Sequence, residues 1–531
     1  MLKSVMPVPS RVLVPEVLPA VMPQLPAVPE FLPAAPAAPV LPSRVPADLP
    51  AEGRRELAAA LAGPLPGAQR KAPGKTVLPD DGSPLAWDDA EMTRFLGFLR
   101  SMSDRRDPRG RRLPLDYLVA VAVAAGAAGD DSAEGAAAWA ASAPARLLHR
   151  LGAPRDAAGR PRRPDASAFS RVLGDPRHAQ QADDVLCAWT AARARDLRPG
   201  MRRHLRAGGR ALRGAARGGR APMLLSGLWD DGTTAAQLPV HGKTNEIPVF
   251  RDLLDKIPAG DLKDAVISAD QMHTQRKHAE KIQAAGGFFI FTIGDNQEKL
   301  SGAADALPWR AFAGQAWTVD RGHGRIDVRT IKALPPTGQI LRKWPEVRQV
   351  FLAERYSYGT GGELLGAVAV LGITSLPPDQ AGAADLLAYL RGHWAIEMHH
   401  YVRDVVFGED GSRAAAAHQA FAAIRNAVTG AFRLLRVPGI AAQLRASRRD
   451  PYRLPLQLLG LAALPRHPPD TTPRHGRDQT GPTAGSRHNR NAVTSAKEDS
   501  TISRLHEKGL CRHPALGAWP AAISDECAHS S

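Results

Sequence analysis

Apolar residues recur at helical spacing through the first patterned region of the chain, residues 86–196. The run MTRFLGFLRSM and the alanine-rich residues 117–129 are both typical of helices that bury at least one face. Residues 117–129 form the most apolar run, but they are well short of the roughly 20 residues that cross a bilayer. We therefore expect an all-helical domain over 86–196 that contains a buried helix, and we expect no membrane segment.

The period shortens from Met223 onward, where strand-like and helix-like runs alternate. APMLLSGLWDDGTTAAQLPV indicates two strands around a turn, and DAVISAD and FFIFTIG indicate buried strands on either side of a helix. In HGRIDVR, polar and apolar residues alternate as in a half-exposed strand. Alternating strands and helices favour a sheet that is at least partly parallel, so residues 200–440 are expected to form a mixed α/β domain.

Two stretches without such periodicity flank these domains. Much of residues 1–85 carries a proline every few positions, which disfavours helices and sheet ladders and predicts a disordered or polyproline-like segment. Residues 441–531 are expected to form a polar tail that is mostly disordered. A native tail and an out-of-frame extension would both give such text, and the sequence leaves the two open.

The chain is strongly basic, with 69 Lys and Arg against 53 Asp and Glu and a formal net charge of +16. This excess favours a polyanionic partner such as nucleic acid, although a general preference for arginine would give the same charge without a function. Three cysteines without a CxxC pair argue against a disulfide framework or a cysteine zinc site. The cysteine content fits a reducing cytoplasm.

Two carboxylates stand where a ligand could bind. Asp270 ends the buried strand AVISAD, at the carboxyl end where α/β sheets hold ligands, although a helix cap is the competing interpretation. Glu397 lies on a half-buried helix and, seven residues before Asp404, shares a face with it. A salt bridge to Arg391 or Arg403 is the alternative role for Glu397, because a half-buried glutamate is costly unless it is matched.

Three histidines, His393, His399 and His400, surround Glu397 in the sequence. Neither their spacing nor a nearby cysteine supports a zinc site, so we interpret them as hydrogen-bonded or exposed side chains. The GRALRGA segment lacks the GxxxxGK[ST] pattern, which argues against a nucleotide-binding phosphate loop.

Taken together and in order, the motifs of the chain resemble those of the H-repeat-associated family of insertion-sequence transposases, which belong to the DDE class. The resemblance covers residues 95–435. The matching text is DRRDPRGRRLPL, FSRVL, RALRGA, KTNEI, ISADQMHTQ, IGDNQ, HGRIDVR, RGHWAIE and VRDVVFGEDGSR. The order and spacing of these short motifs make the resemblance specific.

The resemblance implies a ribonuclease-H-like domain with a mixed sheet and flanking helices, preceded by a helical domain. It implies cleavage and strand transfer of double-stranded DNA at terminal inverted repeats, by a homodimer on DNA located at the nucleoid. It also implies two Mg²⁺ or Mn²⁺ ions held by Asp, Asp and Glu, for which carboxylate oxygens are suitable ligands. Asp270 matches the second Asp of the family and Glu397 matches its Glu.

The first catalytic Asp of the family is absent. Gly208 stands at its position, Arg210 stands at a lysine, and the preceding text MRRHLRA does not read as a buried apolar strand. Gly294 likewise occupies a position where the family leads us to expect lysine. We therefore expect catalysis to be impaired. Asp230 or Asp231, at the end of the next strand, could replace the missing carboxylate, and the sequence leaves this open.

The arginines near these motifs are candidates for DNA contacts, because each Lys or Arg at a phosphate releases counterions. The candidates are Arg210, Arg213, Arg325, Arg391 and Arg403. Two further interpretations remain: an inactive DNA-binding relic or repressor derived from a transposase, and a basic nucleic-acid-binding protein unrelated to recombination. The run of motifs argues against the second.

Overall fold

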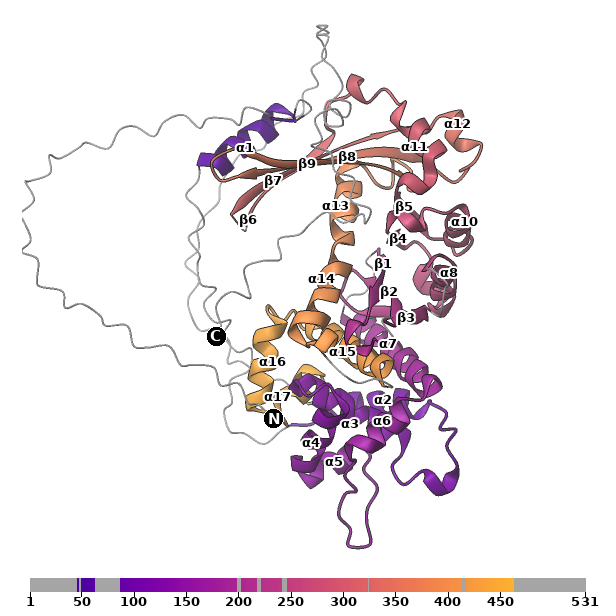
Figure 1. The fold of residues 1–531 in the computed structure, drawn as a ribbon, viewed down its shortest axis with the longest axis vertical. Coiled ribbons are helices and arrows are strands. Elements are labelled where there is room, and N and C mark those ends of the chain that lie inside the picture. Colours follow the sequence, from indigo (N-terminus) through magenta and orange to yellow (C-terminus); the bar gives the residue numbers. More distant parts are fainter. Residues whose placement is uncertain are drawn as a thin grey trace, which may run out of the picture. The chain divides into compact units, whose positions relative to one another are not determined.

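The fold is described from a computed structural model, which covers residues 45–46, 49–62, 86–197, 202–216, 221–240, 246–322, 324–411 and 417–462 (Figure 1). All statements about structure below refer to these residues. Most of the prolines of the first 85 residues, and all residues after 462, lie outside them.

The first folded region is helical, as the sequence predicts. It consists of α2 (Asp89–Arg100), α3 (Leu115–Ala128), α4 (Ala133–Ser142), α5 (Ala145–Arg150), α6 (Ala166–Leu173) and α7 (Pro176–Leu197). Asp88, Ser132 and Asp165 each accept a backbone N–H at the start of a helix, which satisfies one of the free donors there.

Helix α3 lies at the centre of this region and is buried on every side, which confirms the expected buried helix. Small alanines allow neighbouring helices to approach it closely. Among the described residues no single helix is long and apolar enough to cross a membrane. One pair of segments, Pro108–Ala128 and Ala133–Ser142, meets the length and composition criteria only jointly and bends by 92° between them.

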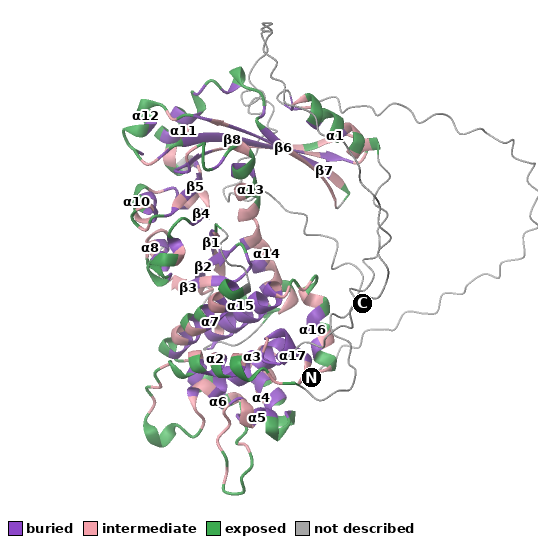
Figure 2. Ribbon diagram, turned by 180° about the vertical axis from the view of Figure 1, so that it is seen from behind, coloured by how far each residue is buried: buried purple, intermediate pink, exposed green. Residues whose placement is uncertain are grey.

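The helical core is completed by the end of the described chain. Helices α15 (His418–Leu434), α16 (Ile440–Arg449) and α17 (Leu454–Leu458) share one apolar cluster with α2 to α7 (Figure 2). The contact is close: a Cβ built on Gly126 of α3 would lie 2.9 Å from Ile424 of α15. The predicted boundary at 440 is therefore wrong, and residues 441–462 are folded rather than part of a disordered tail.

The described strands form one nine-stranded sheet in the order β3-β2-β1-β4-β5-β9-β8-β7-β6. The strands are β1 (His204–Ala211), β2 (Met223–Trp229), β3 (Thr234–Val240), β4 (Val266–Ala269), β5 (Phe288–Thr292), β6 (Ala316–Gly322), β7 (Arg325–Leu334), β8 (Gln349–Gly359) and β9 (Leu364–Thr374).

The first five strands have the ribonuclease-H-like arrangement. Strands β3, β2 and β1 pair antiparallel, and β4 and β5 continue parallel to β1, so the predicted mixed α/β fold is confirmed. Helices α8 (Glu246–Lys256), α9 (Ala259–Leu262) and α10 (Arg276–Ala284) pack on one face through an apolar core. Helices α13 (Ala383–His393) and α14 (Ala395–Tyr401) lie on the other face (Figure 1).

Between β5 and α13 the chain inserts the antiparallel strands β6 to β9, preceded by α11 (Glu298–Asp305) and interrupted by α12 (Gly338–Leu341). The polar face of HGRIDVR is less exposed than the alternation predicts, because Asp327 is only 8% exposed. Ile326 and Val328 are fully buried, as predicted. They are covered by α1 (Ala51–Ala62), whose Leu57 joins the same apolar cluster. A disordered segment over all of residues 1–85 is therefore wrong, since α1 is an ordered helix.

Candidate active site

Gly208 and Asp270 follow the last paired residues of two neighbouring parallel strands. The pairing of β1 with β4 ends at Ala207 and Ala269, so the next residue on each strand is Gly208 and Asp270 respectively. Adjacent strands lie about 4.8 Å apart, and residues in parallel register point to the same face. A carboxylate at position 208 would therefore lie beside Asp270, on the face covered by α13 and α14.

Asp270 is an ionised carboxylate at this edge. Burial alone would raise its pKa, but a hydrogen bond from His393 and the nearby His273 and His400 outweigh burial, so the pKa of Asp270 lies below its ordinary value. His393 Nε2 is 3.4 Å from Asp270 Oδ1. The side chain of Asp270 makes no capping hydrogen bond to the turn Gln271–His273 that follows it, so the helix-cap interpretation is not supported.

Glu397 projects from α14, and its side chain is 39% exposed. Among the described residues, the titratable side chain that contacts it is that of His400, whose Nδ1 lies 3.9 Å from Glu397 Oε2. Burial lowers the pKa of His400. The alternative salt bridges do not form, because Arg391 pairs with Asp320 and Arg403 pairs with Glu409. After α14 the helix widens into a π turn, Val402–Val406, and Asp404 within it contacts Arg210.

The space in front of Gly208 is filled by the helix that carries Glu397. A Cβ built on Gly208 would lie 3.1 Å from Ile396 Cγ1 and 3.7 Å from His400 Cε1. Ile396 is fully buried, so it has little freedom to withdraw. Glycine at 208 thus permits a close contact between β1 and α14 that a carboxylate would disturb.

Asp230 and Asp231 do not replace the missing carboxylate. Strand β2 runs antiparallel to β1 and pairs Trp229 with Leu205, so both aspartates lie at the opposite end of β1, about 13 Å along the strand from Gly208. They have partners there: the backbone N–H of His204 donates to Asp230, and Asp231 accepts from Arg203.

The residues present do not fit a pair of divalent ions. DDE transposases generally use divalent metal ions, and a two-ion site needs carboxylates that bridge and flank both. Asp270 and Glu397 supply two hard oxygen ligands, but the described residues contain no group of three or more His, Cys, Asp or Glu side chains placed to hold a metal. Gly208 stands at the third position, and the apolar carbons Cγ1 and Cγ2 of Ile396 lie in front of it.

Gly294 lies at the same edge, after β5. A Cβ built there would be 2.7 Å from Oε1 of Gln271, the residue that follows Asp270. The side-chain amide of Gln271 therefore occupies the space that the Cβ atom of a lysine at position 294 would need.

Strand β1 forms and is buried despite its polar sequence, so the expectation that MRRHLRA is not a buried strand is wrong for residues His204–Ala211. Leu205 and Ala207 enter the apolar core on the α8 side, while His204, Arg206 and Arg210 face α13 and α14. Arg206 donates to the carbonyl of Trp229. Each of these polar side chains thus has at least one partner inside the fold, although the Nε atoms of Arg206 and Arg210 are buried without a hydrogen bond. A strand held by such partners does not need the usual apolar sequence of a central strand.

Arg210 ties β1 to the segment that follows Glu397. It donates to the carbonyl of His400 at 2.7 Å and to Asp410 at 3.1 Å, and its Nε lies 3.2 Å from Glu409. Arg403 is 0% exposed and is paired with Glu409. Neither side chain is available to a DNA backbone in this structure, so these two expected DNA contacts are corrected to structural ion pairs.

The other three candidate arginines are open to solvent to different degrees. The side chain of Arg213 is 80% exposed, that of Arg391 is 39% exposed and that of Arg325 is 27% exposed. Arg391 of α13 reaches Asp320 of β6, which Arg329 of β7 also contacts, so α13 and the inserted strands share one arginine-rich face.

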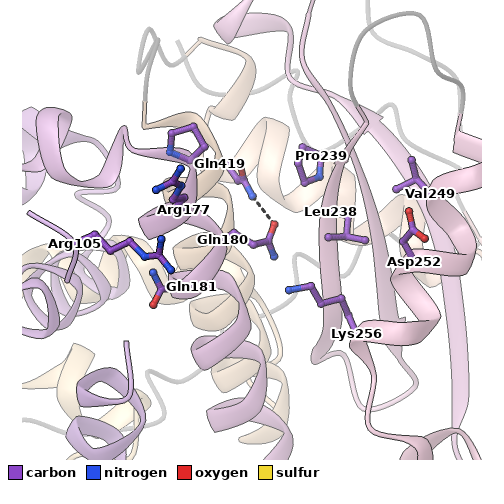
Figure 3. A pocket seen from close by; sticks show the side chains of 11 residues that line it. Arg105, Arg177, Gln180, Gln181, Leu238, Pro239, Val249, Asp252, Lys256 and Gln419 are labelled. Carbon is purple, nitrogen blue, oxygen red and sulfur yellow. Dashed lines mark hydrogen bonds between the residues drawn. The ribbon is translucent and has the colours of Figure 1, made fainter. Parts of the chain in front are cut away.

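A separate groove of about 920 Å³ lies between α7, β3 and α8 (Figure 3). Leu238, Pro239 and Val249 form its apolar wall, and Arg105 and Arg177 lie on the α7 side. Neither Asp270 nor Glu397 lines this groove, so it is not part of the candidate site.

Asp270, Glu397 and Gly208 can be singled out from the sequence, but the groups around Asp270 cannot. The sequence predicts hydrogen-bonded or exposed histidines, and in the structure His393 bonds to Asp270 and to Ser268. Ser268 and His204 lie within strands and belong to no recognisable motif. The polar residues His204, Arg206 and Arg210, which recur at every second or fourth position of β1, are the sequence feature that could have indicated a polar network on this face.

The transposase DDE domain family matches residues 209–428. A putative transposase, YncI, from Escherichia coli O157:H7 is 26% identical over 219 residues, covering 39% of this chain and 55% of the relative. An H repeat-associated putative transposase, YbfD, from Escherichia coli strain K12 is 37% identical over 98 residues, covering 18% of this chain and 38% of the relative. The chain spans about half the length of the first curated relatives it matches.

Among solved structures, the chain is similar to the piggyBac transposase synaptic complex with hairpin DNA, determined by cryo-EM. The TM-score is 0.34 at 11% sequence identity, over 70% of this chain and 79% of that one.

Proposed function

We propose that this chain, which belongs to the DDE class of insertion-sequence transposases, binds double-stranded DNA at the terminal inverted repeats of its element and is impaired in metal-dependent cleavage and strand transfer. The observation that carries the proposal is the register of β1 and β4, which makes Gly208 the neighbour of Asp270. One of three carboxylates is then missing from the site. Loss of a ligand of this kind costs several kcal/mol of transition-state stabilisation, or orders of magnitude in rate.

The packing around Gly208 supports impairment beyond a single substitution. Ile396 and His400 occupy the place of the lost side chain, and both are buried. Restoring aspartate alone would push its Cβ into Ile396. The side chains around position 208 are therefore packed for glycine, so restoring a carboxylate requires space for its side chain in addition to the substitution itself.

DNA binding is supported by the basic character of the chain and by the arginine-rich face of α13 and the inserted strands. Arg391 lies near the end of α13, six residues before Glu397 of α14, so a DNA backbone held by Arg391 would pass near the candidate site. An inactive DNA-binding relic or repressor is the alternative function, and it requires the same binding surface with no residual cleavage.

A nicking assay tests the proposal. Full-length protein is incubated with DNA that carries the ends of its element, with Mg²⁺ or Mn²⁺, and cleaved strands are counted. We expect little or no cleavage by the natural chain and a small gain with Gly208→Asp. The double variant Gly208→Asp with Ile396→Ala, which removes the Cγ1 and Cγ2 carbons that face position 208, is expected to gain most.

The controls define the outcome. Ile396→Ala alone should not restore cleavage, and adding Asp270→Ala to the double variant should abolish any gain. Cleavage by the natural chain that survives Asp270→Ala would refute the site. Failure of the double variant to cut, while it still folds and binds DNA, would favour the relic or repressor.

Binding is tested separately, by fluorescence anisotropy on end DNA at several salt concentrations. A phosphate-contacting surface predicts that the logarithm of the association constant falls linearly with the logarithm of salt concentration. Arg391→Ala should reduce the slope by about one phosphate contact. Arg276→Ala, on an exposed arginine of α10 at the opposite face of the sheet, is the control and should leave the slope unchanged. Analytical ultracentrifugation of the complex tests the expected homodimer.

A further inference from the structure

A chain of hydrogen bonds runs from the interior of β1 to Asp270. His204 Nε2 lies 2.7 Å from Ser268 Oγ, and Ser268 Oγ lies 2.8 Å from His393 Nδ1. The other ring nitrogen of His393, Nε2, lies 3.4 Å from Asp270 Oδ1. The four side chains come from β1, β4, α13 and the end of β4, so they connect two strands and a helix.

Burial decreases toward the candidate site. His204 is 4% exposed and Ser268 is 3% exposed, whereas the side chains of His393 and Asp270 are 20% and 38% exposed. The inner end is held in place: the ring of His204 packs edge-on against Tyr389, and a Cβ on Gly392 would lie 3.3 Å from His204 Nδ1. A rigid inner end and an accessible outer end are what a positioning device requires.

The donors and acceptors of the chain have one consistent assignment for neutral rings. Burial, with Arg206 and His393 nearby, lowers the pKa of His204 well below its ordinary value, so His204 is neutral and carries one N–H. Asp270 can accept from Nε2–H of His393, and in that Nε2–H tautomer the Nδ1 atom of His393 is an acceptor. The hydroxyl of Ser268 then donates to His393 and accepts from Nε2–H of His204.

We propose that His393 is the positioning residue for Asp270, and that Ser268 and His204 hold the His393 ring in the orientation and tautomer that the carboxylate needs. The inference rests on the proposed function only in treating Asp270 as a site residue. Partners of this kind fix the ring of a histidine that contacts a reacting group. Asp270 therefore remains organised although Gly208 beside it carries no carboxylate.

NMR of the full-length protein, labelled with ¹³C and ¹⁵N in histidine and at the aspartate carboxyl carbon, tests this at one fixed pH without DNA or metal. His204→Gln, His393→Gln and Asp270→Asn assign the signals. We expect both natural rings in the Nε2–H tautomer. In Ser268→Ala, the His393 ring should lose the single tautomer and the Asp270 carboxyl signal should move in the direction seen with His393→Gln.

Two variants separate positioning from general destabilisation. Ser268→Thr keeps the hydroxyl and should restore both signals. Ser226→Ala removes another buried serine hydroxyl, which donates from β2 to Gln237 of β3, and should leave both signals unchanged. An Asp270 signal that moves in His393→Gln but not in Ser268→Ala or His204→Gln would overturn the proposal, as would an unchanged signal in all three. These outcomes do not depend on cleavage, so they are distinct from a failure of the proposed function.

Discussion

The two faces of β1 are held in the fold by different forces. Toward α8, Leu205 and Ala207 are fully buried in an apolar core. Toward α13 and α14, His204, Arg206 and Arg210 are held by hydrogen bonds and ion pairs. An apolar face accepts any neighbour of suitable volume, whereas a polar face requires each group to be matched. The polar face therefore ties β1 to one particular helix, the one that carries Glu397.

The largest expected effect is on the apolar face. Leu205→Ala removes a fully buried side chain and leaves a cavity, so it should lower the free energy of unfolding by about 3–4 kcal/mol. Urea unfolding measures the loss. Leu365→Ala, on a side chain 59% exposed, is the matched control and should change stability by less than about 0.5 kcal/mol. A loss at Leu205 as small as this would mean that the apolar face contributes little.

On the polar face, stability should depend on pH through Glu409, which pairs with Arg210. Burial would raise its pKa, but Arg403, Arg425 and Arg210 outweigh burial and lower it from 4.5 to about 2. Because the pKa of Glu409 is lower in the folded state than in the unfolded state, its contribution to stability is complete above its ordinary pKa and is lost as the pH falls toward 2. The loss should be about 3 kcal/mol.

Unfolding measured from neutral to acidic pH checks this dependence. Glu409→Gln should flatten the slope below about pH 5, whereas Glu280→Gln, on an exposed side chain, should not. Equal slopes in the natural chain and in Glu409→Gln would show that the arginines do not stabilise the charge of Glu409.

Arg210→Met tests the link between β1 and the segment after Glu397. The change leaves Asp404 and Asp410 without this cation, while Glu409 keeps Arg403 and Arg425. Breaking a buried pair costs roughly 3–5 kcal/mol, and the remaining partners reduce this to about 2 kcal/mol. Thermal unfolding measures it, with Arg213→Met as the exposed control. If both variants unfold alike, Arg210 is not a tether.

The smallest effects are expected at the two glycines near the end of β1. A Cβ on Gly208 meets the buried Ile396 at 3.1 Å, so Gly208→Ala should cost about 1 kcal/mol. At Gly209, on the opposite face, a Cβ would meet the carboxylate of Glu246, the far end of a flexible side chain that can rotate away, so Gly209→Ala should cost less. Chemical unfolding of the two variants gives the order directly, and the reverse order would contradict the packing described for the two faces.

The outcomes at individual residues show why some features were predictable. The strand before Asp270 is a short apolar run, buried on both faces, so its pattern and its carboxyl end could be read locally. Strand β1 could not be recognised, because Arg210 is matched by Glu409 and Asp410, about 200 residues further along the chain. Helix α1 could not be recognised for the same reason, because its Leu57 is buried against the inserted strands, which come much later in the chain.

The sequence by itself determined the helical and α/β regions, the resemblance of the α/β domain to a transposase family, and the candidate positions Asp270, Glu397 and Gly208. Those features depend on local periodicity and on the order of short motifs. Only the tertiary structure decided that Asp230 and Asp231 lie at the opposite end of β1 from Gly208, that Arg210 and Arg403 are ion-paired inside the fold, and that Ile396 packs against Gly208. These are contacts between distant segments, and their geometry exists only once the sheet and its helices have packed.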